Sequence, residues 1–282
     1  MVSIYYVDGE FLPAAEAKIP VDDLSVLRGY GIFDYMRTYS GKPIFLKQHL
    51  KRLRQSADQI GLGLPWSLEE LTEIVMQTLS RNDNDESNIR IVVTGGSSPD
   101  FITPQGSPRL IVMITPLLKF PEVWTADGIK LVTLRFSRNI PGAKSIDYIQ
   151  AIVAQQKARA QGAVEVVYVG RQNQVLEGTT SNIFAFAGEA LITPGDGILN
   201  GITRKTVIEL AEPKLNVVIR NLVLDELLGA KEVFITSSNR GVLPVVQIDD
   251  RSIGTGKPGD QTRWLMNAFA EHTAKLANQM EI

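Results

Sequence analysis

The sequence predicts an α+β protein with two domains, and three observations lead to this prediction. The chain has 282 residues, enough for one large domain or two smaller ones. Stretches typical of strands and of helices are mixed without the strict alternation of a parallel α/β sheet. From residue 116 to 128 no hydrophobic period is sustained and two prolines occur. We therefore expect a domain at residues 1–117, a linker at 118–129 and a second domain at 130–282.

The first domain is expected to contain two hairpins, two helices and two further strands, at residues 4–12, 31–45, 46–60, 67–79, 89–94 and 110–115. Asp8-Gly9 is typical of a tight hairpin turn. Apolar residues from 46 to 60 recur at intervals of three and four, and Gly61 follows as a helix-ending residue. Ser67 and Glu70 have the spacing of a capping box, which marks the start of the next helix.

The second domain is expected to be rich in strands, at residues 130–136, 164–169, 174–177, 183–186, 190–193, 216–220, 233–236 and 245–248. Helices are expected at 145–161, 203–211, 225–228 and 261–280. In the first of these helices, the residues expected to face the core are Ile149, Ile152, Val153 and Ala160. The segment from Gly254 to Gly259 matches the G-x-G-x-x-G pattern of dinucleotide-binding loops. Pro258 lies inside it and no βαβ unit surrounds it, so we expect a plain loop.

Composition narrows the possible functions. A net charge of −2 and a pI of about 5.8 indicate no basic surface for nucleic acid. Cysteine is absent and histidine occurs twice, which excludes disulfides, thiol nucleophiles and a histidine-rich metal centre. No apolar run approaches the roughly 18 residues of a membrane span, and the N-terminus lacks the features of a signal peptide. We expect a cytoplasmic enzyme without a metal.

An acidic residue at an interrupted strand is the first candidate for chemistry. Glu177 ends an apolar strand, and Gly178 breaks that strand before a run of small or polar residues. Both flanks are apolar, so we expect the bend to lie against the core with Glu177 partly buried. A buried carboxylate requires a cation or strong hydrogen-bond donors beside it.

Lys144 is the second candidate. It ends the irregular segment Ile140-Pro-Gly-Ala-Lys144 and precedes the helix expected from residue 145. A helix dipole disfavours a cation at its N-terminus, so we expect a lowered pKa for this amine, as a lysine that bonds to carbonyl groups requires. Most lysines are solvated surface charges, and this stretch alone leaves that interpretation of Lys144 open.

Further segments carry groups that bind anions. Gly201-Ile202-Thr203 comes at the start of an expected helix, where unpaired backbone N–H groups and the Thr203 hydroxyl suit a phosphate. Arg52 offers a bidentate contact, although a lone arginine on a helix is equally an ordinary surface charge. The run from Thr236 to Asn239 ends a strand with several donors, which by itself is typical of a turn.

Four motifs together resemble the fold-type IV pyridoxal-phosphate enzymes. In chain order they are His49-Leu-Lys-Arg52-Leu, Ile140-Pro-Gly-Ala-Lys144 with Tyr148, Leu176-Glu-Gly-Thr-Thr-Ser-Asn-Ile-Phe184, and Ile198-Leu-Asn-Gly-Ile-Thr203. The resemblance extends from about Tyr5 to the last helix. It implies a small N-terminal α/β domain and a larger, cofactor-binding C-terminal domain like a β-barrel with helices. It also implies a homodimer with active sites at the subunit interface.

The resemblance implies roles around pyridoxal 5′-phosphate for individual residues. Lys144 would bond to the cofactor and move a proton from the substrate Cα, and Glu177 would face the pyridine nitrogen and keep it protonated. Tyr148 would place its phenol near the lysine. The residues expected to bind the cofactor are Arg52, Lys144, Tyr148, Glu177, Gly201, Ile202, Thr203, Ser238 and Asn239.

Substrate choice in this family depends on how the substrate carboxylate is held. The D-amino-acid aminotransferases carry an arginine and a histidine in the loop after the strand at 89–94, whereas residues 98–102 here contain neither. We expect Arg28 and Arg90 to bind the carboxylate instead, with Phe33 and Tyr35 lining the side-chain pocket. The resemblance implies that Arg28 acts in the neighbouring subunit.

We therefore expect a D-amino-acid aminotransferase that uses donors such as D-alanine or D-glutamate and 2-oxo acid acceptors in a ping-pong reaction. The alternatives are a branched-chain L-amino-acid aminotransferase, a lyase of the aminodeoxychorismate type, and a non-catalytic protein on the same scaffold. Branched-chain enzymes are similar to this chain between Lys144 and Tyr148 but differ around Arg28. Intact Lys144, Glu177 and Arg52 disfavour a non-catalytic protein.

Overall fold

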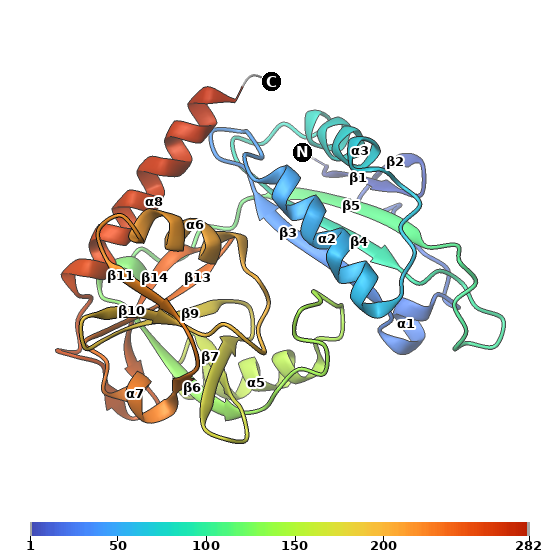
Figure 1. Ribbon diagram of the computed structural model, residues 1–282. Helices are drawn as coiled ribbons and strands as arrows, with labels where there is room; N and C mark the ends of the chain where they lie inside the picture. The colour runs from blue at the N-terminus through green and yellow to red at the C-terminus, as the bar shows by residue number, and fades with distance from the viewer. Residues whose placement is uncertain (1, 281–282) are drawn as a thin grey trace. The chain divides into compact units, whose positions relative to one another are not determined.

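The structure is a computed structural model that describes residues 2–280 (Figure 1). The chain divides into two compact units. Unit 1 comprises Met1–Leu118, Gly142–Tyr148 and Ala274–Ile282, and unit 2 comprises Lys119–Pro141 and Ile149–Thr273. The sequence prediction ended the first domain at residue 117 and assigned residues 142–148 and 274–282 to the second. Long-range hydrogen bonds explain the difference, because they attach both short segments to unit 1.

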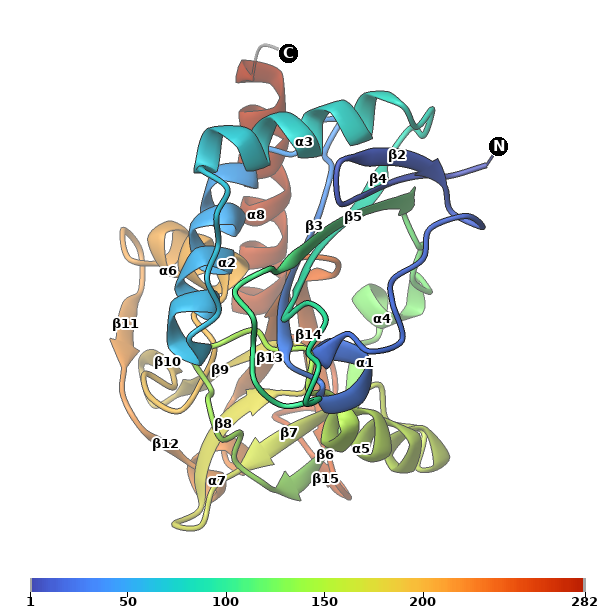
Figure 2. The ribbon, with the colours of Figure 1, turned by 90° about the vertical axis from the view of Figure 1, so that its right-hand side faces the viewer.

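Unit 1 is an antiparallel sheet with strand order β2-β1-β5-β4-β3. The strands are β1 (Ile4–Val7), β2 (Glu10–Pro13), β3 (Gly31–Arg37), β4 (Ser87–Thr94) and β5 (Arg109–Pro116). The helices of unit 1 are α1 (Leu24–Arg28), α2 (Leu46–Ile60) and α3 (Leu68–Ser80). Figure 2 shows α2 and α3 beside this sheet. Leucines of both helices share one core with the buried residues of β4, so α2 and α3 cover the same face.

Local signals in the sequence correctly predicted the ends of these helices. Gly61 ends α2 in the left-handed conformation, with φ of 68°. The capping box at the start of α3 is formed, because the Ser67 Oγ accepts from the Glu70 N–H and the Glu70 carboxylate accepts from the Ser67 N–H.

Unit 2 is built on a second sheet, with strand order β11-β10-β9-β13-β14-β6-β7-β8-β12 and β15 paired with β14. Its strands are β6 (Ile129–Arg135), β7 (Glu165–Val169), β8 (Gln174–Gly178), β9 (Asn182–Ala187), β10 (Ala190–Thr193), β11 (Asn216–Ile219), β12 (Leu222–Val223), β13 (Glu232–Ser237), β14 (Gly241–Ile248) and β15 (Arg251–Ser252). Its helices are α4 (Val123–Ala126), α5 (Ile149–Ala160), α6 (Ile202–Ala211), α7 (Leu224–Leu228) and α8 (Asp260–Gln279), the last of which ends in unit 1.

Two short connections force the sheet of unit 2 to curl. The edge strands β11 and β12 lie at opposite ends of the strand order, yet residues 220–221 alone separate them in sequence. Residues 179–181 likewise join β8, near one end, to β9, near the other. The two ends must therefore approach each other. The curled sheet encloses a core of Val, Ile and Leu side chains, as the prediction of a barrel-like domain requires.

The helix expected from residue 145 begins later and faces differently. Helix α5 begins at Ile149, because Ser145 forms an isolated bridge with Ile32 of β3 and extends the chain before the helix. The inward prediction for Ile149, Ile152, Val153 and Ala160 was also wrong: Ile149, Ile152 and Val153 are exposed by 69%, 56% and 42%, and Ala160 is exposed too. The buried face consists of Ala151, Ala154 and Ala158, whose small side chains let the helix approach β6 and β7 closely.

The segment from Gly254 to Gly259 is a loop, as predicted. It connects β15 to α8, and β15 pairs antiparallel with β14 rather than forming a parallel βαβ unit. Gly254 and Gly256 have positive φ angles of 52° and 73°. Within residues 2–280, none of the helices combines the length and the hydropathy that crossing a membrane requires.

The two glycines of this loop give a matched test of the backbone. Gly256→Ala should lower the free energy of unfolding by about 1 kcal/mol, the cost of a left-handed alanine. Gly254→Ala should cost clearly more, because its Cβ would lie 2.1 Å from the Lys231 carbonyl oxygen, whereas at Gly256 the nearest atom is 3.8 Å away. Urea unfolding of both variants measures the difference. Equal midpoints would show that the loop backbone is not constrained as described.

Candidate active site

Lys144 lies in an extended segment beside β3. The Phe33 N–H donates to the Lys144 carbonyl oxygen (2.9 Å), and the Lys144 N–H donates to the Ser56 Oγ on α2 (3.1 Å). Because α5 begins at Ile149, Lys144 lies outside the first turn, where a helix dipole acts. The dipole of α5 therefore gives no reason to expect a lowered pKa for the Lys144 amine. Hydrogen bonds to β3 and α2 hold the backbone of this lysine instead.

Phe33 is the centre of a group of predicted site residues in unit 1. The Lys144 Nζ lies 4.6 Å from the Phe33 ring centroid, and the Tyr148 ring meets the Phe33 ring edge-on at 5.3 Å. The Arg90 guanidinium lies 5.2 Å from the Phe33 centroid and 5.4 Å from that of Tyr35. Tyr35 and Arg90 are paired across β3 and β4. These five side chains therefore belong to one cluster, on the sheet face opposite α2 and α3.

Arg28 is not part of this cluster. It lies at the end of α1, exposed, and its guanidinium donates to the Leu27 carbonyl oxygen (2.9 Å). Helix α1 is anchored through Asp23, a buried N-cap that accepts from the Ser25 N–H (2.8 Å) and from the Thr94 hydroxyl of β4 (2.7 Å). The position of α1, which ends at Arg28, is therefore defined in part by β4.

Arg52 pairs with Asp34, a buried acid that was not predicted as a site residue. Asp34 accepts from the Arg52 Nε (2.9 Å) and Nη2 (2.7 Å) and lies 2.7 Å from the His49 Nδ1. Burial raises the pKa of Asp34, but Arg52 and His49 outweigh burial and hold the pKa well below its usual range. Burial also lowers the pKa of His49, which favours a neutral imidazole at pH 7.

A signal for Asp34 was present in the sequence. It is the one acidic position in the apolar strand Gly31-Ile-Phe-Asp-Tyr-Met36. Side chains alternate along a strand, so Asp34 lies on the same face of β3 as Ile32 and Met36. This face meets α2, the helix that carries His49 and Arg52. An acid on that face requires a basic partner from the covering helix.

Glu177 is buried as expected, with 5% of its surface exposed. Its cationic partner is Arg138, which had not been singled out. The Arg138 Nε donates to the Glu177 Oε1 (2.8 Å), and the Leu199 N–H donates to Oε2 (2.8 Å). Arg138 also donates to the Pro141 carbonyl oxygen, three residues before Lys144 in sequence. Arg138 therefore fixes both the carboxylate and the end of the segment that leads to the lysine.

The start of α6 presents backbone donors, as predicted. Gly201 is its N-cap and makes no side-chain capping bond, so the first N–H groups of the helix lack a partner of that kind. A Cβ on Gly201 would lie 2.0 Å from the Asn182 Oδ1, so only glycine fits this close approach. The Asn182 Nδ2 donates to the Leu199 carbonyl oxygen (2.8 Å), which ties the loop before α6 to the start of β9.

The run from Thr236 to Asn239 lies next to the same point of the sheet. Thr236 of β13 pairs with Asn182 of β9. The Thr236 Oγ1 is buried and has no hydrogen-bond partner in the part of the chain that the structure describes. Ser237 donates to the Asn239 side-chain oxygen (2.9 Å) and shapes the turn. Unit 2 thus brings Glu177, the start of α6 and this turn together around Asn182.

A phosphate group fits this part of unit 2. The helix start offers N–H groups and a favourable dipole, the glycine allows close backbone approach, and the orphaned Thr236 hydroxyl is a buried donor that needs an acceptor.

Comparison with known proteins decides the family. Residues 31–248 match the family model described as amino-transferase class IV. The chain belongs to the class IV aminotransferases. A protein of Methanocaldococcus jannaschii, provisionally named a branched-chain-amino-acid aminotransferase, is 34% identical over 280 residues that cover 96% of each chain. The D-alanine aminotransferase of Staphylococcus epidermidis is 31% identical over 274 residues, covering 95% of this chain and 96% of that protein.

Solved structures confirm the predicted fold. A branched-chain amino acid aminotransferase determined with pyridoxamine 5′-phosphate superposes with a TM-score of 0.91 at 27% identity and covers 98% of this chain and 95% of that chain. The enzyme of Thermoproteus uzoniensis, determined with norvaline, has a TM-score of 0.87 at 27% identity, with coverage of 99% and 97%. This class IV aminotransferase thus has the fold-type IV architecture, and its cofactor is pyridoxal 5′-phosphate.

The buried pair of Asp34 and Arg52 yields a prediction about stability and pH. Asp34→Asn should lower the free energy of unfolding at pH 7 by about 3 kcal/mol, because it leaves a buried guanidinium without its charge partner. The pKa of Asp34 is lowered in the folded state, so its stabilising effect is present above the ordinary value of 3.8 and is lost as the pH falls. The difference from wild type should therefore shrink below about pH 4.

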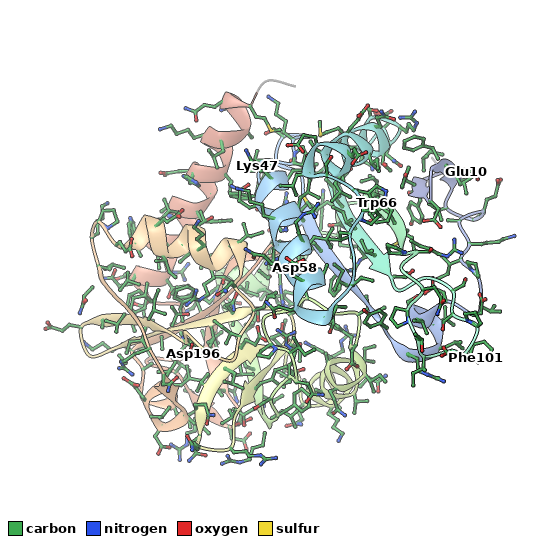
Figure 3. The ribbon with its side chains drawn as sticks, turned by 45° about the vertical axis from the view of Figure 1, so that its right-hand side comes forward. Glu10, Lys47, Asp58, Trp66, Phe101 and Asp196 are labelled. Carbon is green, nitrogen blue, oxygen red and sulfur yellow. The ribbon has the colours of Figure 1, made fainter. Side chains whose placement is uncertain are left out.

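Denaturant unfolding between pH 3 and pH 7 measures this difference. Asp58→Asn is the matched control, because Asp58 is exposed on α2 (Figure 3) and should change stability by less than about 0.5 kcal/mol. An Asp34→Asn protein as stable as wild type at pH 7 would contradict the assigned ion pair.

Proposed function

We propose that this class IV aminotransferase moves amino groups between D-amino acids, of the D-alanine and D-glutamate kind, and 2-oxo acids. The observation that carries the proposal is the Arg90 guanidinium beside Phe33 and Tyr35, in the cluster that contains Lys144. Arg90 is exposed, and a guanidinium beside aromatic rings suits a substrate carboxylate. Relatives named D-alanine aminotransferases, 31% to 32% identical, support the proposal.

The proposed roles follow from the chemistry of the side chains. When bound, pyridoxal 5′-phosphate supplies a carbonyl that accepts amino groups and a ring that withdraws electrons from the substrate Cα. We assign to the Lys144 Nζ the covalent attachment of the cofactor and the transfer of the Cα proton. Glu177, positioned by Arg138 and the Leu199 N–H, would keep the proton on the pyridine nitrogen of the bound cofactor. We assign Tyr148 to cofactor binding as well, and its ring meets the Phe33 ring edge-on at 5.3 Å.

The phosphate is assigned to Arg52, the backbone of Gly201–Thr203, and the turn that carries Ser238 and Asn239. Fixed donors of this kind hold the reacting bond at the Cα in one orientation, and such positioning accounts for much of the rate enhancement. Asp34 serves the same purpose, since it restricts the Arg52 guanidinium to one rotamer.

We infer that the chain acts as a homodimer in which Arg28 contributes to the partner's active site. Exposed apolar residues occur on the same helix and on the loop after β4: Val26 is exposed by 56%, and Ile102 by 68%. Figure 3 shows Phe101 of that loop beside α1. Phe101 is 48% exposed and has a positive φ of 61°, a strained conformation for a bulky residue. Such strain with exposed apolar surface is typical of a binding interface.

A second candidate function is a branched-chain L-amino-acid aminotransferase. It is favoured by the names of the Methanocaldococcus jannaschii protein and of the structure determined with pyridoxamine 5′-phosphate. The two functions require opposite faces of the same substrate carbon, so one assay separates them.

Single amino acids mixed with the holoenzyme, without a keto acid, decide between the candidates. We expect D-alanine and D-glutamate to convert the cofactor absorbance to that of its amine form, and L-leucine to leave it unchanged. Conversion by L-leucine alone would establish the branched-chain activity. Pyruvate release from aminodeoxychorismate without a keto acceptor would indicate the lyase and contradict both.

Arg90→Met tests the carboxylate contact. Loss of a bidentate contact of about 1.5–3 kcal/mol should lower kcat/KM for D-alanine about 10- to 100-fold, mainly by raising KM. Arg37→Met is the matched control, because Arg37 lies on β3 against Tyr39, outside the Phe33 cluster, and should leave KM unchanged. Arg28→Met should resemble Arg90→Met. If both variants transaminate D-alanine as wild type does, the arginines do not bind the carboxylate.

A further inference from the structure

A second buried carboxylate lies in unit 2, apart from Glu177. Glu165 begins β7 and is fully buried. Glu165 lies on the same face of β7 as Val167, which belongs to the core that the curled sheet encloses. The hydroxyl of Thr180 donates to its Oε2 (2.6 Å), the hydroxyl of Thr179 donates to its Oε1, and the Gln155 Nε2 donates to Oε1 (2.5 Å). The hydroxyl groups of the bend after Glu177 are therefore engaged by Glu165.

Arg240 is the cation that accompanies Glu165. Its Nη2 donates to the Glu165 Oε2 (2.8 Å) and to the Thr180 Oγ1 (2.7 Å), and its Nε donates to the Ser237 Oγ (3.2 Å). Its side chain is 8% exposed. Burial raises the pKa of Glu165, but Arg240 and the two threonine hydroxyls outweigh burial and lower it, so the pair is charged at pH 7.

The pair bridges two loops that lie side by side at the ends of paired strands. The bend at 179–181 leads into β9, the turn at 238–240 follows β13, and Asn182 of β9 pairs with Thr236 of β13. A guanidinium has donors in a rigid plane, so bonds to Glu165, Thr180 and Ser237 fix the orientation of both loops.

We propose that Arg240, held by Glu165, is a positioning residue that sets the orientation of the cofactor-phosphate donors Ser238 and Asn239. Arg240 follows these two residues directly in sequence and bonds to Ser237 before them, so it fixes the turn from both ends. This inference rests on the proposed role of Ser238 as a phosphate donor. Arg240 itself does not touch the reacting atoms.

The test is phosphorus NMR of the holoenzyme, together with the rate at which it releases its cofactor. Arg240→Met should move the bound-phosphate resonance and speed cofactor release about tenfold, the effect of one weakened charge-assisted contact. Glu165→Gln should have the same effect, and the double variant should be little worse than either single one, because both residues act through the same turn. Arg220→Met is the matched control, since Arg220 forms an exposed ion pair with Glu226 in unit 2 and should change neither readout.

Ser238→Ala is the reference for the donor role. If Arg240→Met lowers the thermal midpoint but leaves the resonance and release rate unchanged, while Ser238→Ala alters them, the pair is merely structural and the proposal is wrong. If Ser238→Ala also leaves them unchanged, the assignment of the donors fails, and the inference with it. If Arg240→Met does not fold, Arg240→Lys decides. Lysine keeps the buried positive charge but lacks the planar set of N–H donors of a guanidinium. An unaltered bound-phosphate resonance in Arg240→Lys would therefore contradict the proposal.

Discussion

The curl of the sheet in unit 2 is the constraint on which the proposed cofactor-binding features of that unit depend. Strands from opposite ends of the strand order are joined by residues 179–181 and 220–221, so the sheet cannot lie flat. The first of these connections directly follows Gly178, the residue after Glu177. Curling places the end of β8 near the loop before α6, where the Leu199 N–H reaches the carboxylate. Without this closure, Glu177 and the start of α6 would belong to distant parts of the sheet.

Three buried carboxylates, each paired with an arginine, are the second common feature. Asp34 pairs with Arg52, Glu177 with Arg138, and Glu165 with Arg240. Such pairs are weak evidence for stability, because desolvation offsets much of the attraction. They do specify geometry, since each guanidinium makes several bonds in a fixed plane. This is consistent with an enzyme whose catalysis depends on holding a cofactor in one orientation.

Much of the fold could be predicted from local sequence. The hairpin at Asp8-Gly9, the capping box at Ser67 and the end of α2 at Gly61 are set by neighbouring residues, and each was correct. The start of α5 was not, because the pairing of Ser145 with Ile32 joins residues far apart in sequence. The buried face of α5 was wrong for a related reason. The close approach of β6 and β7 selects alanines over the larger apolar residues, and that distance is invisible in the sequence.

The site was predicted unevenly for the same physical reason. Motifs singled out Lys144, Glu177, Arg52 and the start of α6 as candidates, since each has a characteristic residue type next to a turn or a helix end, and their roles stay predictions. The partners Arg138, Asp34 and Arg240 were missed, because their contacts depend on tertiary structure. Asp34 alone had a usable signal, as an acid on the helix-facing side of an apolar strand.

The central claim is that one amine, on Lys144, bonds to the cofactor. Borohydride reduction of the holoenzyme makes such a bond permanent, and peptide mapping by mass spectrometry then identifies the residue. The account predicts a single labelled peptide, with the reduced cofactor on Lys144. Label on another lysine, or protein that remains unlabelled although the cofactor is bound, would contradict it.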